Sequence, residues 1–427
     1  MHRRHFYLGA TAALSATRVR GANERVQMGI VGLGGRGTAH NQTYLGIPSA
    51  QVVALCDVNQ AALEKANAAV TRASQPKAKE YRDMRELFAD KSVDAVSTAT
   101  PNHWHALTTI WACQAGKDVY CEKPASHNIH EGWRMIEVAR KTGRMVQIGS
   151  QSRTTAHKMR AIKLLHEGVI GKLYLAKGLC YKRRKSIGRT PETDVPPGIN
   201  WDLFLGPAPN RRFTMNRFKY NWHWFWDTGN GDLGNQGVHE MDLALWGMGL
   251  KTFPRSVVST GGKFVYDDDQ ETPNTQHASF QHDGVEVQFE VRGLMTSGEG
   301  PVGVGKSNSA IGNLFYGSEG WMWLGHSGFQ VFKGDHSEKV MDEKPAGESY
   351  DTKSHMENFL QAVKSRKHQD LTADIEIGAL AAAHCHLANI SYRMGRQLEW
   401  DAAKKQFVNA PDASRLLTRE YRKPYAV

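Results

Sequence analysis

Two hydrophobic patterns alternate along residues 26–150. Short apolar runs are typical of buried strands, and longer runs with apolar residues three or four positions apart are typical of amphipathic helices. The expected strands are Val26–Val31, Gln51–Asp57, Asp94–Ala99, Asp118–Cys121 and Met145–Ile148, and the clearest expected helices are Gln60–Thr71 and His103–Ala115. This alternation predicts an α/β fold with a doubly wound parallel sheet.

After residue 150 the pattern changes to short strands with alternating polarity. Val285–Arg292 alternates strictly, and Asp283 and Gly284 before it form a hairpin signal. Further strands are expected at Lys172–Tyr181, Ala278–His282, Gly312–Tyr316, Trp321–Leu324 and Phe329–Phe332, and helices at Ala156–Glu167, Ser354–Ser365 and Ala373–Arg393. We therefore expect a C-terminal α+β domain with an open, mostly antiparallel sheet and helices on one face.

Two segments show no such pattern. Residues 296–313 are rich in glycine and serine and are expected to form a mobile loop or flap. The charged segment 414–427 is expected to fray or to pack on a neighbouring subunit.

The first 22 residues resemble a twin-arginine export signal. Arg3 and Arg4 precede an apolar stretch of about 12 residues, too short to cross a bilayer core of ~30 Å. We expect cleavage, no membrane anchor afterwards and a periplasmic protein, or a cytoplasmic one if the leader is not functional. An extension that happens to hold two arginines is the alternative.

Charge and cysteine usage exclude some functions. The formal net charge is +11, but four arginines lie in the leader, and Lys182–Lys185 has no interleaved aromatic residues, so nucleic-acid binding is not expected. The five cysteines form no C-x-x-C pair and are expected to be buried. The pairs His103/His105 and His384/His386 lack a third ligand at zinc-like spacing, so no metal is expected.

A glycine-rich loop follows the first strand directly. In its G-x-G-x-x-G pattern, Gly32 permits the tight turn, Gly34 lets the backbone approach a pyrophosphate, and Gly37 lets helix and strand pack closely. The helix N-terminus then faces the phosphates. We assign Gly32, Gly34, Gly35, Arg36 and Gly37 to a nicotinamide dinucleotide site in a Rossmann domain.

Asp57 ends the second strand, 25 residues after Gly32. A carboxylate there accepts the ribose hydroxyls and repels a 2′-phosphate, so NAD is favoured over NADP, although Arg36 could partly compensate. The structural alternative for Asp57 is a helix N-cap.

Three further motifs complete a pattern. They are Thr100-Pro101-Asn102-His103-Trp104-His105, Glu122-Lys123-Pro124 and Gly237-x-His239-x-x-Asp242. With the glycine loop, they resemble the Gfo/Idh/MocA family of oxidoreductases from about Val26 to about Asp401. The resemblance implies that Thr100, Asn102, His105, Glu122 and Lys123 lie at the cofactor and that Lys123 and His239 are catalytic.

The chemistry of Lys123 and His239 suits oxidation of a hydroxyl group. Partial desolvation at a strand end would lower the pKa of Lys123, which could orient the hydroxyl or stabilise an alkoxide. His239, with an ordinary pKa of ~6.5, could exchange the proton. Asn235 stands where many family members have an aspartate, and an amide accepts no proton; Asp232 or Asp242 could substitute, in a different geometry.

The aromatic run 220–227 is expected to contact a sugar, with a packed loop or a subunit interface as the alternative. The residues that we assign to substrate binding are Arg153, Trp224, Asn235 and His239.

These predictions give three regions: a leader (1–22), a dinucleotide-binding domain (23–150) and a substrate-binding and oligomerisation domain (151–427). The expected protein is a homo-oligomeric oxidoreductase that acts on a hydroxyl of a sugar or glycoside with tightly bound NAD. An NAD-dependent glycosidase and a non-catalytic dinucleotide-sensing protein remain as alternatives.

Overall fold

The computed structural model describes residues 25–294, 309–346 and 350–427, so the expected leader lies outside the described residues.

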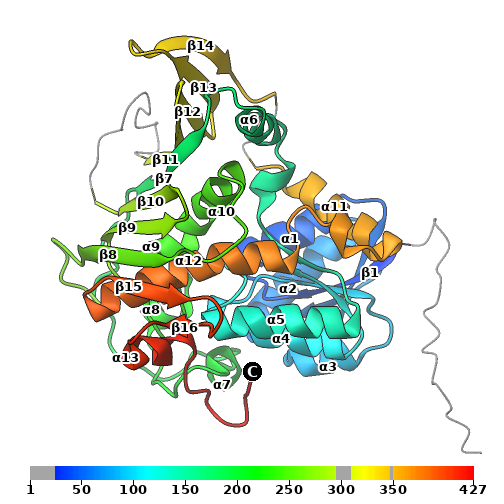
Figure 1. Ribbon diagram of the computed structural model, residues 1–427. Helices are drawn as coiled ribbons and strands as arrows, with labels where there is room; N and C mark the ends of the chain where they lie inside the picture. The colour runs from blue at the N-terminus through cyan, green and yellow to red at the C-terminus, as the bar shows by residue number, and fades with distance from the viewer. Residues whose placement is uncertain (1–24, 295–308, 347–349) are drawn as a thin grey trace, which may run out of the picture.

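The N-terminal half is built on a six-stranded sheet in the order β3-β2-β1-β4-β5-β6, with all strand pairs parallel (Figure 1). The strands are β1 (Val26–Val31), β2 (Ala50–Cys56), β3 (Lys79–Tyr81), β4 (Ala95–Thr98), β5 (Asp118–Cys121) and β6 (Val146–Ile148). The helices are α1 (Gly35–Leu45), α2 (Gln60–Arg72), α3 (Met84–Ala89), α4 (Asn102–Gln114) and α5 (Ile129–Thr142). Ligands of such sheets bind beyond the carboxyl ends of the strands, where the strand order reverses between β1 and β4.

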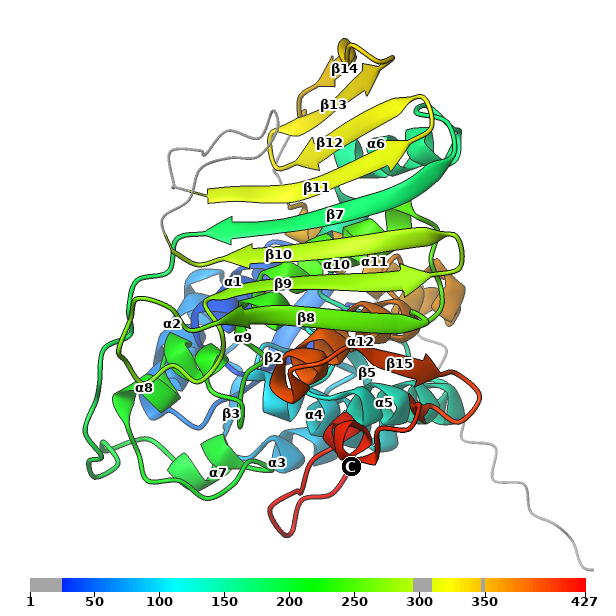
Figure 2. The same cartoon turned by 60° about the vertical axis from the view of Figure 1, so that its left-hand side comes forward.

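The C-terminal half is built on a ten-stranded sheet in the order β14-β13-β12-β11-β7-β10-β9-β8-β15-β16. Only β7 and β10 are a parallel pair among these strands. The strands are β7 (Leu173–Lys182), β8 (Ser256–Gly262), β9 (Thr275–His282), β10 (Val285–Arg292), β11 (Ser309–Gly317), β12 (Gly320–Gly325), β13 (Gly328–Lys333), β14 (Glu338–Glu343), β15 (Leu398–Asp401) and β16 (Gln406–Phe407). Figure 2 shows α6, α10 and α12 behind the sheet, on one of its faces. The predicted fold class is confirmed.

The helices of this half are α6 (Ala156–His166), α7 (Trp201–Leu205), α8 (Met215–Phe218), α9 (Gly231–Asn235), α10 (Gly237–Gly247), α11 (Thr352–Ser365), α12 (Ile375–Met394) and α13 (Pro411–Ser414). Short 3₁₀ turns are η1 (Gln151–Thr154), η2 (Tyr220–Trp224), η3 (His368–Asp370) and η4 (Arg415–Leu417). In the described part of the chain, no helix combines the length and the apolar character needed to cross a bilayer.

The expected hairpin joins β9 to β10. His282 pairs with Val285 across the turn, and Gly284 adopts a φ of 75°, which glycine tolerates without a steric penalty. Along β10, Val287, Phe289 and Val291 point into the core, as the alternation predicts.

The prediction that the glycine- and serine-rich residues 296–313 form a loop or flap is partly wrong. Residues 296–308 lie outside the described residues, but 309–313 belong to β11, between β7 and β12. Gly312 lies here under the Trp323 indole, and a Cβ at this position would come within 2.2 Å of that ring. The expected strand Gly312–Tyr316 is therefore correct, but it begins earlier, at Ser309, inside the segment that was expected to be a flap.

The charged segment 414–427 packs against its own chain rather than fraying. Tyr421 donates a hydrogen bond to Glu131 of α5 (3.1 Å), and the Tyr425 side chain is buried against Trp104 and Trp111 of α4. Its tyrosines make this segment part of the fold, although its charges had suggested exposure.

Helix α12 connects the two halves of the molecule. Ile375, Ala379 and Ala382 belong to the core that contains the parallel sheet, whereas Cys385 and Leu387 belong to the core of the large sheet. A helix shared by two cores limits relative motion of the halves and fixes the geometry of the cleft between them.

Candidate functional site

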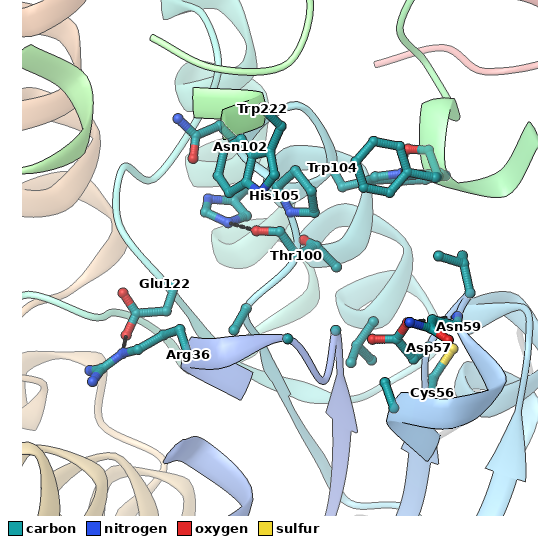
Figure 3. A pocket seen from close by; sticks show the side chains of 18 of the residues that line it. Arg36, Cys56, Asp57, Asn59, Thr100, Asn102, Trp104, His105, Glu122 and Trp222 are labelled. Carbon is teal, nitrogen blue, oxygen red and sulfur yellow. Dashed lines mark hydrogen bonds and ion pairs between the residues drawn. The ribbon is translucent and has the colours of Figure 1, made fainter. Parts of the chain in front are cut away.

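A cavity of about 850 Å³ lies at the carboxyl ends of the parallel strands, bordered by the glycine-rich loop and by residues of the C-terminal half. Figure 3 shows its two ends, with Arg36 and Glu122 on one side of the loop and Asp57 and Asn59 on the other. A large concave site with a few polar groups is typical of cofactor binding.

The loop presents bare backbone to this cavity. Gly34 caps α1 without a side-chain hydrogen bond, and a Cβ on Gly34 or Gly35 would meet nothing within 4 Å. Gly37 has a different function, because a Cβ there would lie 1.7 Å from the carbonyl oxygen of Gly32. The unpaired N–H groups and helix dipole at this end suit the pyrophosphate of a dinucleotide.

Asp57 lies at the end of β2 and borders the cavity. Its carboxylate accepts hydrogen bonds from the backbone N–H groups of Leu33 (2.5 Å) and Asn59 (2.8 Å). Burial raises the pKa of Asp57, and these two bonds oppose the rise. The N-cap of α2 is Asn59, which accepts from Ala61, so the helix-cap alternative for Asp57 is wrong. Two bonds leave acceptor capacity on the carboxylate for a ribose hydroxyl.

Glu122 is buried at the opposite end of the loop. It accepts hydrogen bonds from Arg36 (2.7 Å) and Gln151 (3.0 Å), and His40 Nε2 lies 3.0 Å away. Burial alone would raise the pKa of Glu122, but Arg36 and His40 hold it well below its usual range. Arg36 is thus bound to Glu122 at the end of the cavity remote from Asp57 (Figure 3).

Lys123 follows Glu122 and borders the same cavity. Its ammonium group donates to the carbonyl oxygen of Asn235 (3.0 Å) and to the side-chain oxygen of that residue (3.2 Å). Burial lowers the pKa of Lys123 to about 8, against a partial rise due to Glu122. The amine therefore changes charge within the physiological range, as desolvation at a strand end predicts.

His239 lies on α10, with its ring centroid 5.2 Å from that of Tyr350. Burial lowers its pKa well below the ordinary value, and the charge of Lys123 adds to this effect. Its Nδ1 has no hydrogen-bond partner among the described residues. The imidazole is therefore neutral near pH 7, and the expectation of an ordinary pKa is wrong because desolvation dominates.

The two aspartates that could have replaced the missing relay are each paired with an arginine. Asp232 binds Arg184 through two bonds of 2.7 and 2.8 Å, and Asp242 binds Arg153 through bonds of 2.8 to 3.0 Å. Such bidentate pairs fix the position of both carboxylates. Neither aspartate is placed as a partner of His239.

Thr100, Asn102 and His105 also border the cavity, above the loop in Figure 3. Asn102 donates to Asn230 (2.9 Å). The two ring nitrogens of His105 lie 2.6 Å from the Pro124 carbonyl and 2.9 Å from that of Thr100. His105 thus contacts the two segments that follow β4 and β5.

The residues assigned to substrate binding are not all placed alike. Asn235 borders the cavity, but Arg153, Trp224 and His239 are not among its lining residues. Arg153 is held by Asp242, and Trp224 is 4% exposed. Three neighbours of Trp224 reach the wall instead: Tyr220, Trp222 and His223, the last two stacked at 3.6 Å. The aromatic run was recognisable in the sequence, but the sequence did not show that Tyr220, Trp222 and His223 face the cavity and that Trp224 does not.

The loop before α7 closes the Asp57 end. Asn200 donates its backbone N–H to the Val58 carbonyl (2.9 Å), Gln60 donates to the Gly198 carbonyl (3.0 Å), and Arg82 also binds that carbonyl (2.9 Å). We refer to these contacts as the loop seam. It joins the C-terminal half to the β2–α2 turn beside Asp57 and had no signal in the sequence.

The fold and the site define a two-domain protein with a dinucleotide cleft and a titratable lysine at one end. Two family models match the chain: "Oxidoreductase family, NAD-binding Rossmann fold" over residues 26–150, and "Oxidoreductase family, C-terminal alpha/beta domain" over residues 152–260 and 319–427. The chain belongs to this Gfo/Idh/MocA oxidoreductase family.

Individual relatives are more distant. A "Glycosyl hydrolase family 109 protein" of Saccharopolyspora erythraea is 28% identical over 218 residues, which are 50% of this chain and 42% of that relative. The match thus spans less than half of the curated relative. The WlbA dehydrogenase from Bordetella pertussis, solved with NADH and UDP-GlcNAcA, is 19% identical with a TM-score of 0.66, over 88% of this chain and 99% of that one. Levoglucosan dehydrogenase, solved with NADH and levoglucosan, is 18% identical with a TM-score of 0.67, over the same shares. The two structures show the fold.

Proposed function

We propose that this protein oxidises a hydroxyl group of a sugar or glycoside with a tightly held NAD. The observation that carries the proposal is the position of Lys123, whose amine has a pKa of about 8 and borders the same cavity as the glycine-rich loop. The sugar ligands of the two solved structures named above support the substrate class.

Proton transfer in this proposal depends on Lys123. Its amine uses two hydrogens on the oxygens of Asn235. In the neutral state the third position is a lone pair, which accepts the substrate proton; in the protonated state it is an N–H that stabilises an alkoxide. A bound nicotinamide ring would supply the hydride acceptor, and the hydride would leave the carbon whose hydroxyl group gives its proton to Lys123.

His239 has a different role in this scheme. A neutral imidazole with a strongly lowered pKa is a weak proton acceptor, so His239 orients the substrate hydroxyl through a hydrogen bond. The sequence suggested that His239 exchanges the proton; in this scheme Lys123 exchanges it instead.

The test is a panel of free sugars and aryl glycosides incubated with purified protein. Mass spectrometry identifies the product, and absorbance follows NADH. We expect an oxidised sugar in wild type and a loss of turnover in Lys123→Met with dinucleotide binding retained. Binding of dinucleotide without turnover of any panel member, in wild type and variant alike, would favour the dinucleotide-sensing alternative.

A glycosidase is the second candidate, favoured by the family 109 relative. In that reaction a transient oxidation would acidify a neighbouring C–H bond, the aglycone would leave by elimination, water would add across the resulting double bond, and return of the hydride would restore the hydroxyl group. The same panel distinguishes the two reactions, because a glycosidase releases the aglycone without net NADH or oxidised sugar.

The tight hold on NAD and the export of the protein belong to the proposal together. An exported enzyme meets no ordinary pool of NAD, so the cofactor must enter during folding and be reoxidised on the protein. The loop seam supports tight binding, because its hydrogen bonds join both halves of the chain beside Asp57, where the adenosine of a bound dinucleotide would lie. Expression with residues 1–22 intact, followed by cell fractionation, tests the location.

A further inference from the structure

Residues 418–427, which we call the tail, run from the C-terminal half across to α4. Arg419 donates to the carbonyl oxygens of Asp227 and His103, both at 3.1 Å. Arg422 donates to the carbonyl oxygens of Gly206 (2.7 Å) and Asp202 (2.8 Å) and pairs with the Asp202 carboxylate. Two arginines therefore anchor the tail on both halves of the molecule.

These anchors place Tyr425 at the cavity. Its ring is 7% exposed, meets the Trp104 indole edge to face at 5.4 Å and lies 6.2 Å from the Trp111 ring. Tyr425 and Trp104 both line the cavity, together with Met84 and Arg85. An aromatic pair that closes a wall is a binding surface as well as a packing contact.

The position along the cavity indicates what this wall contacts. Figure 3 places Trp104 on the side of Asp57 and Asn59, away from Arg36 and Glu122. In a Rossmann domain the carboxylate after the second strand marks the ribose of the adenosine half. The surface available to the attached base includes the rings of Trp104 and Tyr425 and the side chain of Met84, beside charged residues such as Arg85, and the aromatic rings suit the face of a purine ring.

We propose that Tyr425 and Trp104 form the wall against which the adenine of the dinucleotide packs, so that the tail completes the cofactor site. The proposal rests on the proposed function only through dinucleotide binding and is independent of the substrate. It assigns to Tyr425 an effect on the affinity for the adenosine half, separate from the chemistry at Lys123.

The experiment measures dissociation constants for NAD, ADP-ribose and nicotinamide mononucleotide with wild type, Tyr425→Phe and Tyr425→Ala. Loss of base–aromatic stacking should weaken NAD and ADP-ribose by about 5- to 150-fold in Tyr425→Ala. Nicotinamide mononucleotide should bind as in wild type. Tyr425→Phe keeps the ring and should stay within about twofold of wild type for all three ligands.

Two results would overturn the proposal. One is unchanged ADP-ribose affinity in Tyr425→Ala; the other is an equal loss for ADP-ribose and nicotinamide mononucleotide, which would indicate general loosening. If Tyr425→Ala does not fold, photolabelling of wild type with an azido-adenine analogue of NAD decides. Label on the tail or on Trp104 supports the contact, and label confined to other segments refutes it. Failure of wild type to bind any of these ligands would instead refute the proposed function.

Discussion

The pKa of Lys123 should control the pH dependence of oxidation, and Asn235→Asp should move it. The side-chain oxygen of Asn235 lies 3.2 Å from the Lys123 nitrogen, so the substitution places a carboxylate at hydrogen-bonding distance from the amine. An opposite charge at that separation raises the pKa of an amine by about 1 to 3 units. The inflection of the rate profile should therefore move from about pH 8 towards higher pH.

The magnitude follows from the fraction of neutral amine. With a pKa of about 8, about a tenth of Lys123 is neutral at pH 7, and this fraction falls about tenfold with each further unit of pKa. Oxidation should thus rise about tenfold per pH unit below pH 8 in wild type and level off above it. Asn235→Asp should be at least about tenfold slower at pH 7 and recover at higher pH.

Glu122→Gln should act in the opposite direction. The carboxylate of Glu122 raises the pKa of Lys123, so its removal shifts the inflection to lower pH and increases the fraction of neutral amine at pH 7. Lys219→Met is a matched control, because Lys219 also borders the cavity but is not among the charges that set this pKa. It should leave the inflection in place.

The assay is single-turnover oxidation between pH 6 and 10 with saturating sugar, with a deuterated substrate to verify that hydride transfer is observed. Lys123→Met should lose the pH slope together with a factor of about 10² to 10⁴ in rate. A flat profile in wild type, or a slope that survives in Lys123→Met, would refute proton transfer to Lys123. Shifts of the same sign in Asn235→Asp and Glu122→Gln would refute the electrostatic reasoning.

Three further outcomes are expected. His239→Ala should lower turnover on the order of 100-fold but keep the inflection near pH 8; disappearance of the inflection would return the proton to His239. Asp57→Ala should weaken NAD more than NADP, since it deletes both a ribose acceptor and a repulsion against the phosphate, and equal losses in two titrations would leave Asp57 with only its bonds to Leu33 and Asn59. Protein purified with its own leader should retain NAD through desalting, at a dissociation constant far below micromolar or better than about −8 kcal/mol; cofactor-free protein that releases stoichiometric NADH would contradict tight binding.

Local patterns predicted five of the six strands of the parallel sheet, and only the three-residue strand β3 was missed. A strand, a glycine-rich turn and a helix within residues 26–45 define one unit, and the position of Asp57 directly after β2 depends on strand length alone. The same holds for the hairpin at Gly284, because turn and alternation are adjacent in the sequence. The strand expected at Gly312–Tyr316 is present as β11, but its start at Ser309 was missed because residues 309–311 continue a glycine- and serine-rich segment that resembles a loop.

Residues of the candidate site could be predicted where their position follows from the end of their own strand. They could not be predicted where their position depends on a partner that is distant in the sequence. Lys123 fulfils the first condition, but its lowered pKa also requires burial, and its hydrogen-bond partner Asn235 lies 112 residues further on. Arg153 illustrates the second condition, since nothing local showed that Asp242 would bind its guanidinium. Tyr425 is the extreme case, because it contacts Trp104 across 321 positions of the chain. Arg419 binds the carbonyl oxygens of His103 and Asp227 from the two halves, Arg422 binds that of Gly206 in the C-terminal half, and together they hold the tail where the two rings meet. No sequence motif marks such a residue, because its position at the cavity depends on how the tail closes the wall. The titrations of the Tyr425 variants with ADP-ribose and nicotinamide mononucleotide test directly whether this wall binds the adenine.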